Sequence, residues 1–207
     1  MSQETATQHA RVPQEERTRL MRARLLEATI QCLVDAGFAG TSTTLVSKIA
    51  GVSRGAQLHH FPTKNDLVVA AVRHLYDQRA AEFEAAQRDL PVGEGRTRAV
   101  LGALAEYVTS PFFTAALELW VAARSDEQLL AAVAPLEIET GRGLHRIAVD
   151  LLQVDETRPG VRELVQATLD LLRGLGLANT LGDDSRRRAR ILDQWAQTLD
   201  RELKELG

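Results

Sequence analysis

The chain has 207 residues, of which 44% are hydrophobic and 4% aromatic, and its formal net charge is −3. This length can bury a sizeable core in one or two domains, and the low aromatic content with abundant Ala, Leu, Arg and Glu favours an all-α protein over a sheet-rich one. The single cysteine, Cys32, excludes an intramolecular disulfide, and the sequence has no apolar run of the roughly 18 residues that a membrane span needs, so we expect a soluble, cytoplasmic protein.

The first part of the chain is more basic than the rest. Residues 1–65 carry eight Lys and Arg against five Asp and Glu, whereas the remaining residues carry 17 against 23. This asymmetry is expected if the first part faces phosphates. Residues 1–14 are polar and lack apolar periodicity, which predicts a disordered N-terminal tail. Glu15 to Ala36 follows as a predicted helix that Gly37 ends.

Residues 41–64 predict two short helices joined by a tight turn. Thr41 is the expected N-cap of the first helix, and Gly51 ends it because glycine tolerates the left-handed conformation that a sharp turn demands. Ser53 is the expected N-cap of the second helix, Arg54 to His60, which a following proline stops. Two helices joined in this way form a helix-turn-helix, whose second helix enters the major groove of DNA.

The second helix carries the side chains that we expect to read bases. Arg54 can donate two hydrogen bonds to a guanine, and Leu58 can contact a thymine methyl group. Lys64, in the first turn of the next helix, can contact a phosphate because free amides and a positive charge meet there. The predicted DNA-binding residues are Thr41, Ser42, Thr44, Lys48, Ser53, Arg54, Gly55, Ala56, Gln57, Leu58, His59, His60 and Lys64.

A set of residues around this motif stands in a fixed register without a gap. These residues are Arg22, Leu25, Leu26, Ala28, Leu33, Gly37, Phe38, Thr41, Ser42, Ala50, Gly51, Val52, Ser53, Gly55, His60, Phe61, Lys64 and Leu67. In this register the run resembles the DNA-binding domain of TetR-family transcriptional regulators. Gln57 and Leu58 depart from the family pattern, which usually has an aliphatic residue and a tyrosine there, so the identity of the base-reading residues stays open.

A long helix is predicted after the motif. Thr63 is its expected cap, and it runs from Lys64 to about Asp89. A proline and two glycines make Leu90 to Gly95 the clearest linker in the chain. The predicted organisation is a tail at 1–14, a helix-turn-helix DNA-binding domain at 15–64, and a helical ligand-binding and dimerisation domain at 65–207.

Three further helices are predicted at residues 96–109, 112–124 and 126–152. The second opens with the densest aromatic patch of the sequence, which either fills an ordinary core or lines an apolar cavity between helices. Pro135 should kink or split the third helix and could open space for a ligand. The predicted ligand-pocket residues are Tyr107, Phe112, Phe113, Leu117, Glu118, Trp120 and His145.

Two closing helices are predicted at residues 161–181 and 185–206, each with an apolar stripe. Gly174 and Gly176 weaken the first by roughly 1 kcal/mol each relative to alanine, a cost that makes sense where another backbone approaches closely. The TetR resemblance implies that these helices pair with their twofold mates in a four-helix bundle. The expected dimer interface is then Leu164, Thr168, Leu172, Leu175, Leu192, Trp195 and Leu199. The alternative is that both stripes complete the core of the monomer.

These features predict a DNA-binding transcriptional regulator rather than an enzyme. One short recognition helix contacts few bases, so we expect a homodimer on a palindromic double-stranded operator, with repression relieved by a small, partly apolar effector. The alternative is a helical ligand-binding or interaction module without sequence-specific DNA binding, which Gln57 and Leu58 would favour. We expect no cofactor and no metal site, because the adjacent His59 and His60 point about 100° apart on a helix and share one ion poorly.

Overall fold

The computed structural model describes residues 14–206, apart from the side chains of residues 84, 86 and 87. Over this range the elements are α1 (Gln14–Gly40), α2 (Thr43–Ala50), α3 (Arg54–His60), α4 (Lys64–Ala86), the 3₁₀ turn η1 (Gln87–Asp89), α5 (Arg96–Val108), α6 (Pro111–Ala123), α7 (Glu127–Leu152), α8 (Val161–Asn179) and α9 (Ser185–Glu205). The predicted all-α fold is confirmed for this part of the chain. The predicted tail lies almost wholly outside the described residues.

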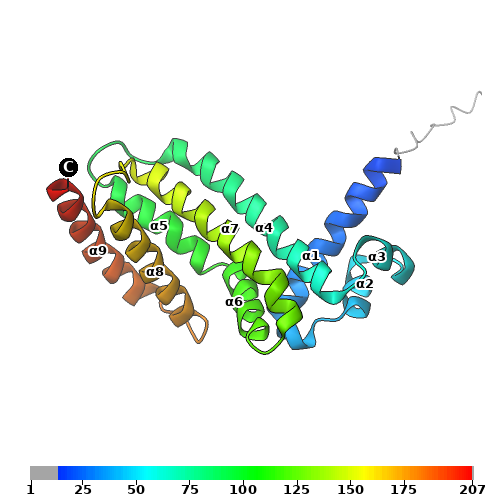
Figure 1. Ribbon diagram of the computed structural model, residues 1–207. Coiled ribbons are helices and arrows are strands. Elements are labelled where there is room, and N and C mark those ends of the chain that lie inside the picture. The colour runs from blue at the N-terminus through cyan, green and yellow to red at the C-terminus, as the bar shows by residue number, and fades with distance from the viewer. Residues whose placement is uncertain (1–13, 207) are drawn as a thin grey trace, which may run out of the picture.

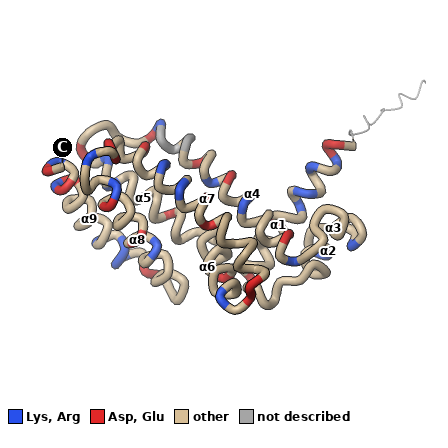
Figure 2. Tube along the Cα trace, in the orientation of Figure 1, with Lys and Arg blue, Asp and Glu red and all other residues tan. Residues whose placement is uncertain are grey.

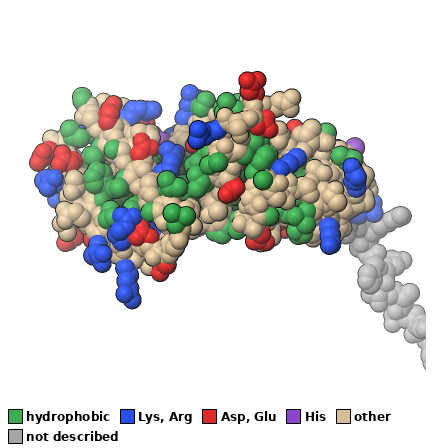
Figure 3. Space-filling model, turned by 90° about the horizontal axis from the view of Figure 1, so that it is seen from below, with side chains coloured by type: hydrophobic (Ala, Val, Ile, Leu, Met, Phe, Trp, Pro, Cys, Tyr) green, Lys and Arg blue, Asp and Glu red, His purple; other side chains and the backbone are tan. Residues whose placement is uncertain are grey.

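The described part of the molecule is elongated, with α2 and α3 at one end and α8 and α9 toward the other (Figure 1). We call the end that holds α2 and α3 the small end, and the part formed by α5 to α9 the body. The long helix α4 runs from the small end along the body. Basic positions recur along the N-terminal half of α1 and occur on α2 and α3, while both signs mix over the body (Figure 2). Seen from below, basic side chains project at both ends and hydrophobic side chains are exposed in patches between them (Figure 3).

The small end has its own hydrophobic core. Leu25 from α1, Val46 from α2 and Phe61 directly after α3 are buried there, together with Leu67 from the first turn of α4. Reciprocal hydrogen bonds between Thr63 and Asp66 start α4, because the Asp66 amide donates to the Thr63 hydroxyl (3.0 Å) and the Asp66 carboxylate accepts from the Thr63 amide (3.1 Å). The predicted cap of α4 is therefore confirmed, and the entry into α4 is fixed next to the motif.

The body holds two further core clusters that meet at α6. One cluster joins α1, α4, α6 and α7 and contains Phe112 and Leu119, and the other joins the end of α4 with α5 to α9 and contains Phe113. Because adjacent residues of α6 point into different clusters, this helix is shared between the region that touches α1 and the region that touches α8.

The connection from α1 to α2 differs from the prediction in one detail. Gly37 has φ 65° and ψ 179°, so the regular part of α1 ends where the sequence predicts. The cap of α2 is Ser42, whose hydroxyl accepts from the Leu45 amide (3.2 Å), and not Thr41. Thr41 is buried and donates its hydroxyl to the Gly37 carbonyl (2.8 Å), so it closes the bend instead of capping the next helix.

The body helices cross closely where glycine is required. A Cβ on Gly176 of α8 would lie 2.4 Å from the Val108 carbonyl oxygen of α5, which is the close backbone approach that the sequence predicts there. A Cβ on Gly174 would meet nothing within 4 Å, so no backbone of the chain itself approaches closely there. Pro135 lies inside α7, which is continuous, so the predicted split of this helix does not occur.

The apolar stripes of α8 and α9 mainly complete the core of the chain itself. Five of the seven residues predicted for a dimer interface are buried in this core: Thr168, Leu172, Leu175, Leu192 and Leu199. The prediction is wrong for these five, because a partner could reach them only if the core opened. Leu164 and Trp195 are half-buried, and the Trp195 indole donates to the Thr168 hydroxyl (3.1 Å).

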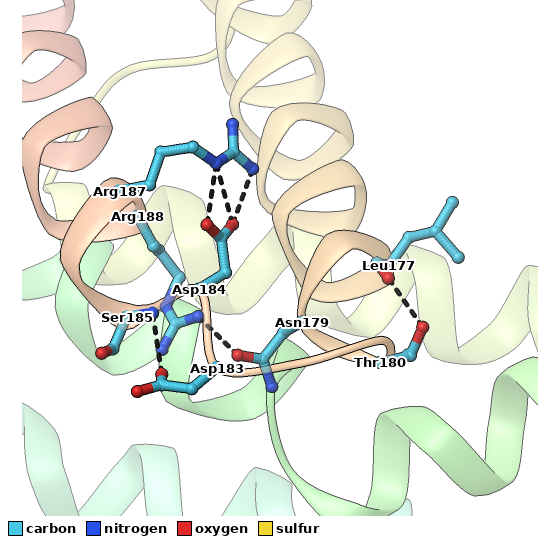
Figure 4. Close-up of polar contacts among 8 residues, drawn as sticks. All are labelled: Leu177, Asn179, Thr180, Asp183, Asp184, Ser185, Arg187 and Arg188. Atoms are coloured by element: carbon cyan, nitrogen blue, oxygen red, sulfur yellow. Dashed lines mark hydrogen bonds and ion pairs between the residues drawn. The ribbon is translucent and has the colours of Figure 1, made fainter.

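Polar contacts fix the turn between α8 and α9 (Figure 4). Arg187 donates to both carboxylate oxygens of Asp184, at 2.8 and 2.6 Å, and Arg188 donates to the side-chain oxygen of Asn179 at 2.8 Å. The Asp183 carboxylate accepts from the Ser185 amide (2.9 Å), at the start of α9. These bonds hold the two helices in one relative orientation. No single helix in the described range is long and apolar enough to cross a membrane, and α5 and α6 pass that test only as a pair bent by 56°.

Candidate nucleic-acid interface and effector cavity

The helix-turn-helix forms as the sequence predicts. Gly51 adopts the left-handed conformation (φ 63°, ψ 37°) and ends α2, and Val52 packs against the core of the small end. The Ser53 hydroxyl accepts from the Ala56 amide (3.2 Å) and caps α3. Phe61 is extended (φ −140°) before Pro62, which ends α3 after seven residues.

Most of the predicted DNA-binding residues lie on the solvent side of α2 and α3. Ser42, Thr44, Lys48, Ser53, Arg54, Gly55, Leu58 and His59 are exposed, and Ala56 and His60 are half-exposed. Arg54 stands at the first position of α3 and has no ion-pair partner among the described residues. The exposed face therefore begins with a guanidinium that is available for a base or a phosphate.

Two of the predicted DNA-binding residues are buried, and the prediction is wrong for both. Thr41 is 3% exposed and closes the bend after α1. Gln57 is 0% exposed, and its side-chain amide donates to the Phe61 carbonyl (2.6 Å), so it ties the end of α3 to the following residue. Gln57 thus occupies the aliphatic position of the resembling pattern as a core residue, and its departure from that pattern does not alter the exposed face.

An apolar cavity lies in the body between α5, α6, α7 and α8. Tyr107, Phe112, Phe113 and Trp120 form aromatic walls, in which the Tyr107 and Phe112 ring centroids are 5.0 Å apart and the Phe113 and Trp120 centroids 5.9 Å apart. The volume of the cavity is about 40 Å³. Ligand pockets are usually roughly 300–1,000 Å³. An effector of more than a few atoms must therefore widen the cavity.

Four of the seven predicted pocket residues line this cavity, and three do not. Leu117 packs into the α5 to α9 cluster instead. Glu118 is exposed and faces α1, where its carboxylate accepts from the Phe38 amide (3.3 Å). His145 is buried at a separate surface groove, and its Nε2 lies 2.8 Å from the Glu156 carboxylate. The predictions for Leu117 and Glu118 are wrong, since these side chains point away from the cavity, and His145 lies outside this cavity at the neighbouring groove.

Sequence reasoning missed the two charged residues of the cavity wall, Glu137 and Arg173. The Trp120 indole donates to the Glu137 carboxylate (3.0 Å), and the Arg173 guanidinium lies 3.7 Å from the other oxygen of that carboxylate. Burial raises the pKa of Glu137, while Arg173 and the Trp120 hydrogen bond act in the opposite direction. No spacing rule could have found this pair, because the two residues lie on different helices 36 positions apart in the sequence. In the part of the chain that is described, no three His, Cys, Asp or Glu side chains converge on a metal position.

Comparison with known proteins gives the family. Residues 25–71, which comprise the second half of α1, the helix-turn-helix and the start of α4, match the family model of bacterial regulatory proteins, tetR family. The chain is also 36% identical over 116 residues to the HTH-type transcriptional regulator CymR of Pseudomonas putida, which covers 56% of this chain and 57% of CymR. Residues 25–71 therefore form a DNA-binding domain of the TetR type.

Other relatives extend the similarity over the body of the chain. It is 29% identical over 168 residues to the HTH-type transcriptional regulator BetI of Burkholderia mallei, which covers 80% of this chain and 84% of BetI. A proposed transcriptional regulator from Pseudomonas aeruginosa PAO1 has a crystal structure that matches with a TM-score of 0.69 at 27% identity, over 91% of this chain and 92% of that one. The chain spans only 57 to 61% of the length of the first curated relatives that it matches.

One further structure shares the fold alone. The regulator FadR of Bacillus subtilis, solved in complex with stearoyl-CoA, matches with a TM-score of 0.63 at 15% identity, over 86% of this chain and 96% of FadR. The relatives are named as transcriptional regulators and not as enzymes, in agreement with the sequence-based prediction.

The junction of the TetR-type helix-turn-helix with the body centres on Phe38. The Lys64 ammonium donates to the Phe38 carbonyl (2.5 Å) and sits 3.8 Å from the centroid of its ring, while Glu118 of α6 accepts from the Phe38 amide. Burial lowers the pKa of Lys64. The prediction that the Lys64 side chain contacts a phosphate is not supported by this geometry, because the ammonium points into the junction. Only the backbone amides at the start of α4 remain for such a contact.

Proposed function

We propose that this protein is a transcriptional regulator that binds a palindromic double-stranded operator as a homodimer and represses transcription until a small, partly apolar effector releases it. The observation that carries the DNA-binding part is the exposed face of α3, which opens on the unpaired guanidinium of Arg54 and continues through Leu58 and His59. A short helix that is capped at its start and free of neighbours on one face suits entry into the major groove.

The DNA-binding proposal is tested by selecting bound fragments from a random DNA pool with the full chain. We expect an inverted repeat whose half-sites are separated by about 34–36 Å or a multiple of it. Arg54→Ala should lower affinity for the selected operator by at least tenfold, since a bidentate base contact contributes roughly 1–3 kcal/mol. Arg124→Ala, at an exposed arginine on the body, is the matched control. Equal affinity for selected and random DNA would favour the alternative of a binding module without sequence recognition.

The dimer that we propose uses the outer faces of α8 and α9 and not the buried stripes. Half-exposed and exposed residues recur at helical spacing on these faces. They are Leu164, Ala167, Leu171, Gly174 and Ala178 on α8, and Ile191, Trp195 and Thr198 on α9. Small residues let two helices approach closely, and leucine and isoleucine supply apolar area to bury.

The proposed dimer face makes a prediction for the oligomeric state. Leu171→Asp should place a charge in the interface and convert the dimer into a monomer in sedimentation equilibrium, while the far-ultraviolet circular dichroism of the helices stays unchanged. Gln166→Asp, on a neighbouring exposed position of α8, is the control. A wild-type chain that sediments as a monomer at the concentration that binds DNA would contradict the proposal.

The effector part of the proposal rests on the cavity. The aromatic walls give apolar area to bury, and Glu137, Thr140 and Arg173 give polar partners for orientation. Because the cavity is small in this conformation, a ligand that fits must displace α6 or its neighbours, and α6 also carries Glu118 at the Phe38 junction. Ligand binding and operator binding would then weaken each other to the same extent.

A further inference from the structure

A wide groove runs along the outside of the cavity, between α7, the loop after it and α8. Its volume is about 730 Å³, far larger than the cavity itself. The two spaces share the same wall residues at one place: Glu137, Gly141, Leu144, Leu169 and Arg173. A Cβ on Gly141 would meet nothing within 4 Å, so this part of the shared wall is not crowded by other atoms. The apolar cavity and the polar groove thus lie next to each other on the two sides of one wall.

The carboxylates of the groove already have partners. Glu139 is paired with Arg73 of α4 (2.7 Å), and Glu156 receives both His145 (2.8 Å) and Arg162 (2.9 Å). The lowered pKa of Glu156, which follows mainly from its hydrogen bond with His145, agrees with this engagement. The third carboxylate, that of Glu137, accepts from the Trp120 indole and faces Arg173 on the cavity wall. The groove therefore offers a cation little negative charge that is not already engaged.

Two arginines of the groove, in contrast, are unpaired among the described residues. Arg142 and Arg146 are exposed on α7, and neither has an ion-pair partner among the described residues. They stand four residues apart, so both occupy one face of the helix and repel each other. An anion placed between them would remove this repulsion, and a guanidinium can bind a carboxylate or a phosphate through two parallel hydrogen bonds.

We infer that the effector is an amphiphilic anion, whose apolar chain or ring enters the aromatic cavity and whose carboxylate or phosphate head lies in the groove between Arg142 and Arg146. This inference rests on the proposed effector-responsive function and specifies its ligand. Gly141 lets the ligand pass from groove to cavity without a side chain in the way. The apolar end widens the cavity and so carries the signal to α6, while the head selects for negative charge.

The opposite ligand class, an apolar cation held by Glu137 among the aromatic rings, is less well matched. The Glu137 carboxylate already accepts from Trp120 and faces Arg173, whose guanidinium also lies 5.8 Å from the Trp120 ring centroid. A cation would have to displace Arg173 and pass the two unpaired arginines of the groove. Tighter binding of an apolar cation than of an apolar anion is therefore the result that would contradict the inference.

The test compares four probes with the same eight-carbon tail, below their micelle concentrations, by isothermal titration calorimetry on the full chain. We expect octanoate and octyl phosphate to bind at least tenfold more tightly than 1-octanol, and octylammonium to bind more weakly than 1-octanol. The advantage of the anions should shrink when the salt concentration rises from 50 to 500 mM, because exposed ion pairs are screened. If octanol equals octanoate, or octylammonium binds most tightly, the anionic head is refuted.

Variants locate the head in the groove. The double substitution Arg142→Gln and Arg146→Gln should abolish the tenfold advantage of octanoate over octanol without changing the affinity for octanol. Arg88→Gln with Arg124→Gln, at two exposed arginines outside the groove, is the control. An advantage that survives the groove variant overturns the inference. Binding of octanoate that leaves operator affinity unchanged would instead refute the effector role in the proposed function, while the anion site would stand.

Discussion

The core of the small end and the cavity of the body are both built from apolar side chains on short stretches of helix, but they are filled differently. Around α2 and α3, Leu25, Val46 and Phe61 are at most 3% exposed. Both helices start at a serine cap, and α2 ends at a left-handed glycine. In the body, four aromatic rings surround a space of about 40 Å³. The small end thus suits a part that must keep one shape to fit DNA, and the body suits a part that must change shape around a ligand.

The largest expected effect concerns the filled core. Phe61→Ala should lower the free energy of unfolding by roughly 3–5 kcal/mol, because it removes a buried ring that packs next to Leu25 and Val46. Phe61→Leu should cost less, since most of the volume is kept. Urea denaturation of both variants measures the difference. If Phe61→Ala costs less than 1 kcal/mol, the small end is not as tightly filled as described.

A second prediction concerns the close crossing of α5 and α8. Gly176→Ala should destabilise the chain by roughly 1–3 kcal/mol, because the new Cβ would meet the Val108 carbonyl oxygen, which is backbone and cannot rotate away. Gly141→Ala, in open space on α7, should stabilise by up to about 1 kcal/mol through helix propensity. The midpoint of thermal unfolding should be lower than that of the wild type for Gly176→Ala and higher for Gly141→Ala. Any other order would contradict the close approach of α5 and α8 at Gly176.

The third prediction sharpens the contrast between the two regions. Glu118→Ala should leave effector affinity almost unchanged but reduce the loss of operator affinity that the effector causes, by threefold or more, because α6 then loses its hydrogen bond to the Phe38 amide. Glu106→Ala, an exposed glutamate on α5, is the control. Gel-shift titrations with and without ligand measure both quantities. Equal release in both variants would show that α6 does not transmit through this contact.

The fourth prediction concerns a substitution that reduces the volume of the cavity. Ala116, on α6, is buried in the cavity wall, and Ala116→Val adds two carbon atoms toward the space. We expect a stability change between zero and a gain of about 1 kcal/mol, since each buried methylene contributes roughly 0.8 kcal/mol. Effector affinity should fall at the same time. Destabilisation by more than 2 kcal/mol in urea would mean that the wall is already full.

The smallest expected effect is a pH dependence of stability at Glu137. Burial raises its pKa in the folded chain, so the folded state binds more protons than the unfolded state over the interval above the ordinary value of 4.5. The contribution of Glu137 to stability should therefore fall as the pH rises through that interval, and Glu137→Gln should remove this contribution. Urea midpoints of both proteins measured in steps from pH 4 to pH 8 test it: the stability of the wild type relative to Glu137→Gln should fall with pH, and a relative stability that rises with pH would contradict the prediction.

The sequence predicts local structure well where a single residue determines the backbone conformation of a turn or of a helix end. Gly51 and Ser53 set the turn of the helix-turn-helix, and the structure confirms both, because a left-handed glycine and a serine cap act through their own neighbours. The ends of α5 to α9 fall within about two residues of the prediction for the same reason. Gln57 could not be placed in this way, since its burial depends on how α3 lies against the rest of the small end.

The sites that need several helices were predicted less well. The aromatic walls of the cavity follow from a dense local patch, but Glu137 and Arg173 meet only after α7 and α8 have packed. A stripe on α8 or α9 shows which side of the helix is apolar without showing whether that side faces its own chain or a second copy. For Leu172 and Leu199 it faces their own chain, which is why the small, half-exposed residues beside them are the better candidates for a dimer.

The contacts at Phe38 have a consequence for how such a chain could diversify. Phe38 of α1 donates its amide to α6 and accepts at its carbonyl from α4, so the helix-turn-helix is joined to the body through main-chain atoms that every amino acid possesses. The side chains that line the cavity can then change without a matching change in the helix-turn-helix. A new stimulus could be adopted while the old target sequence is kept.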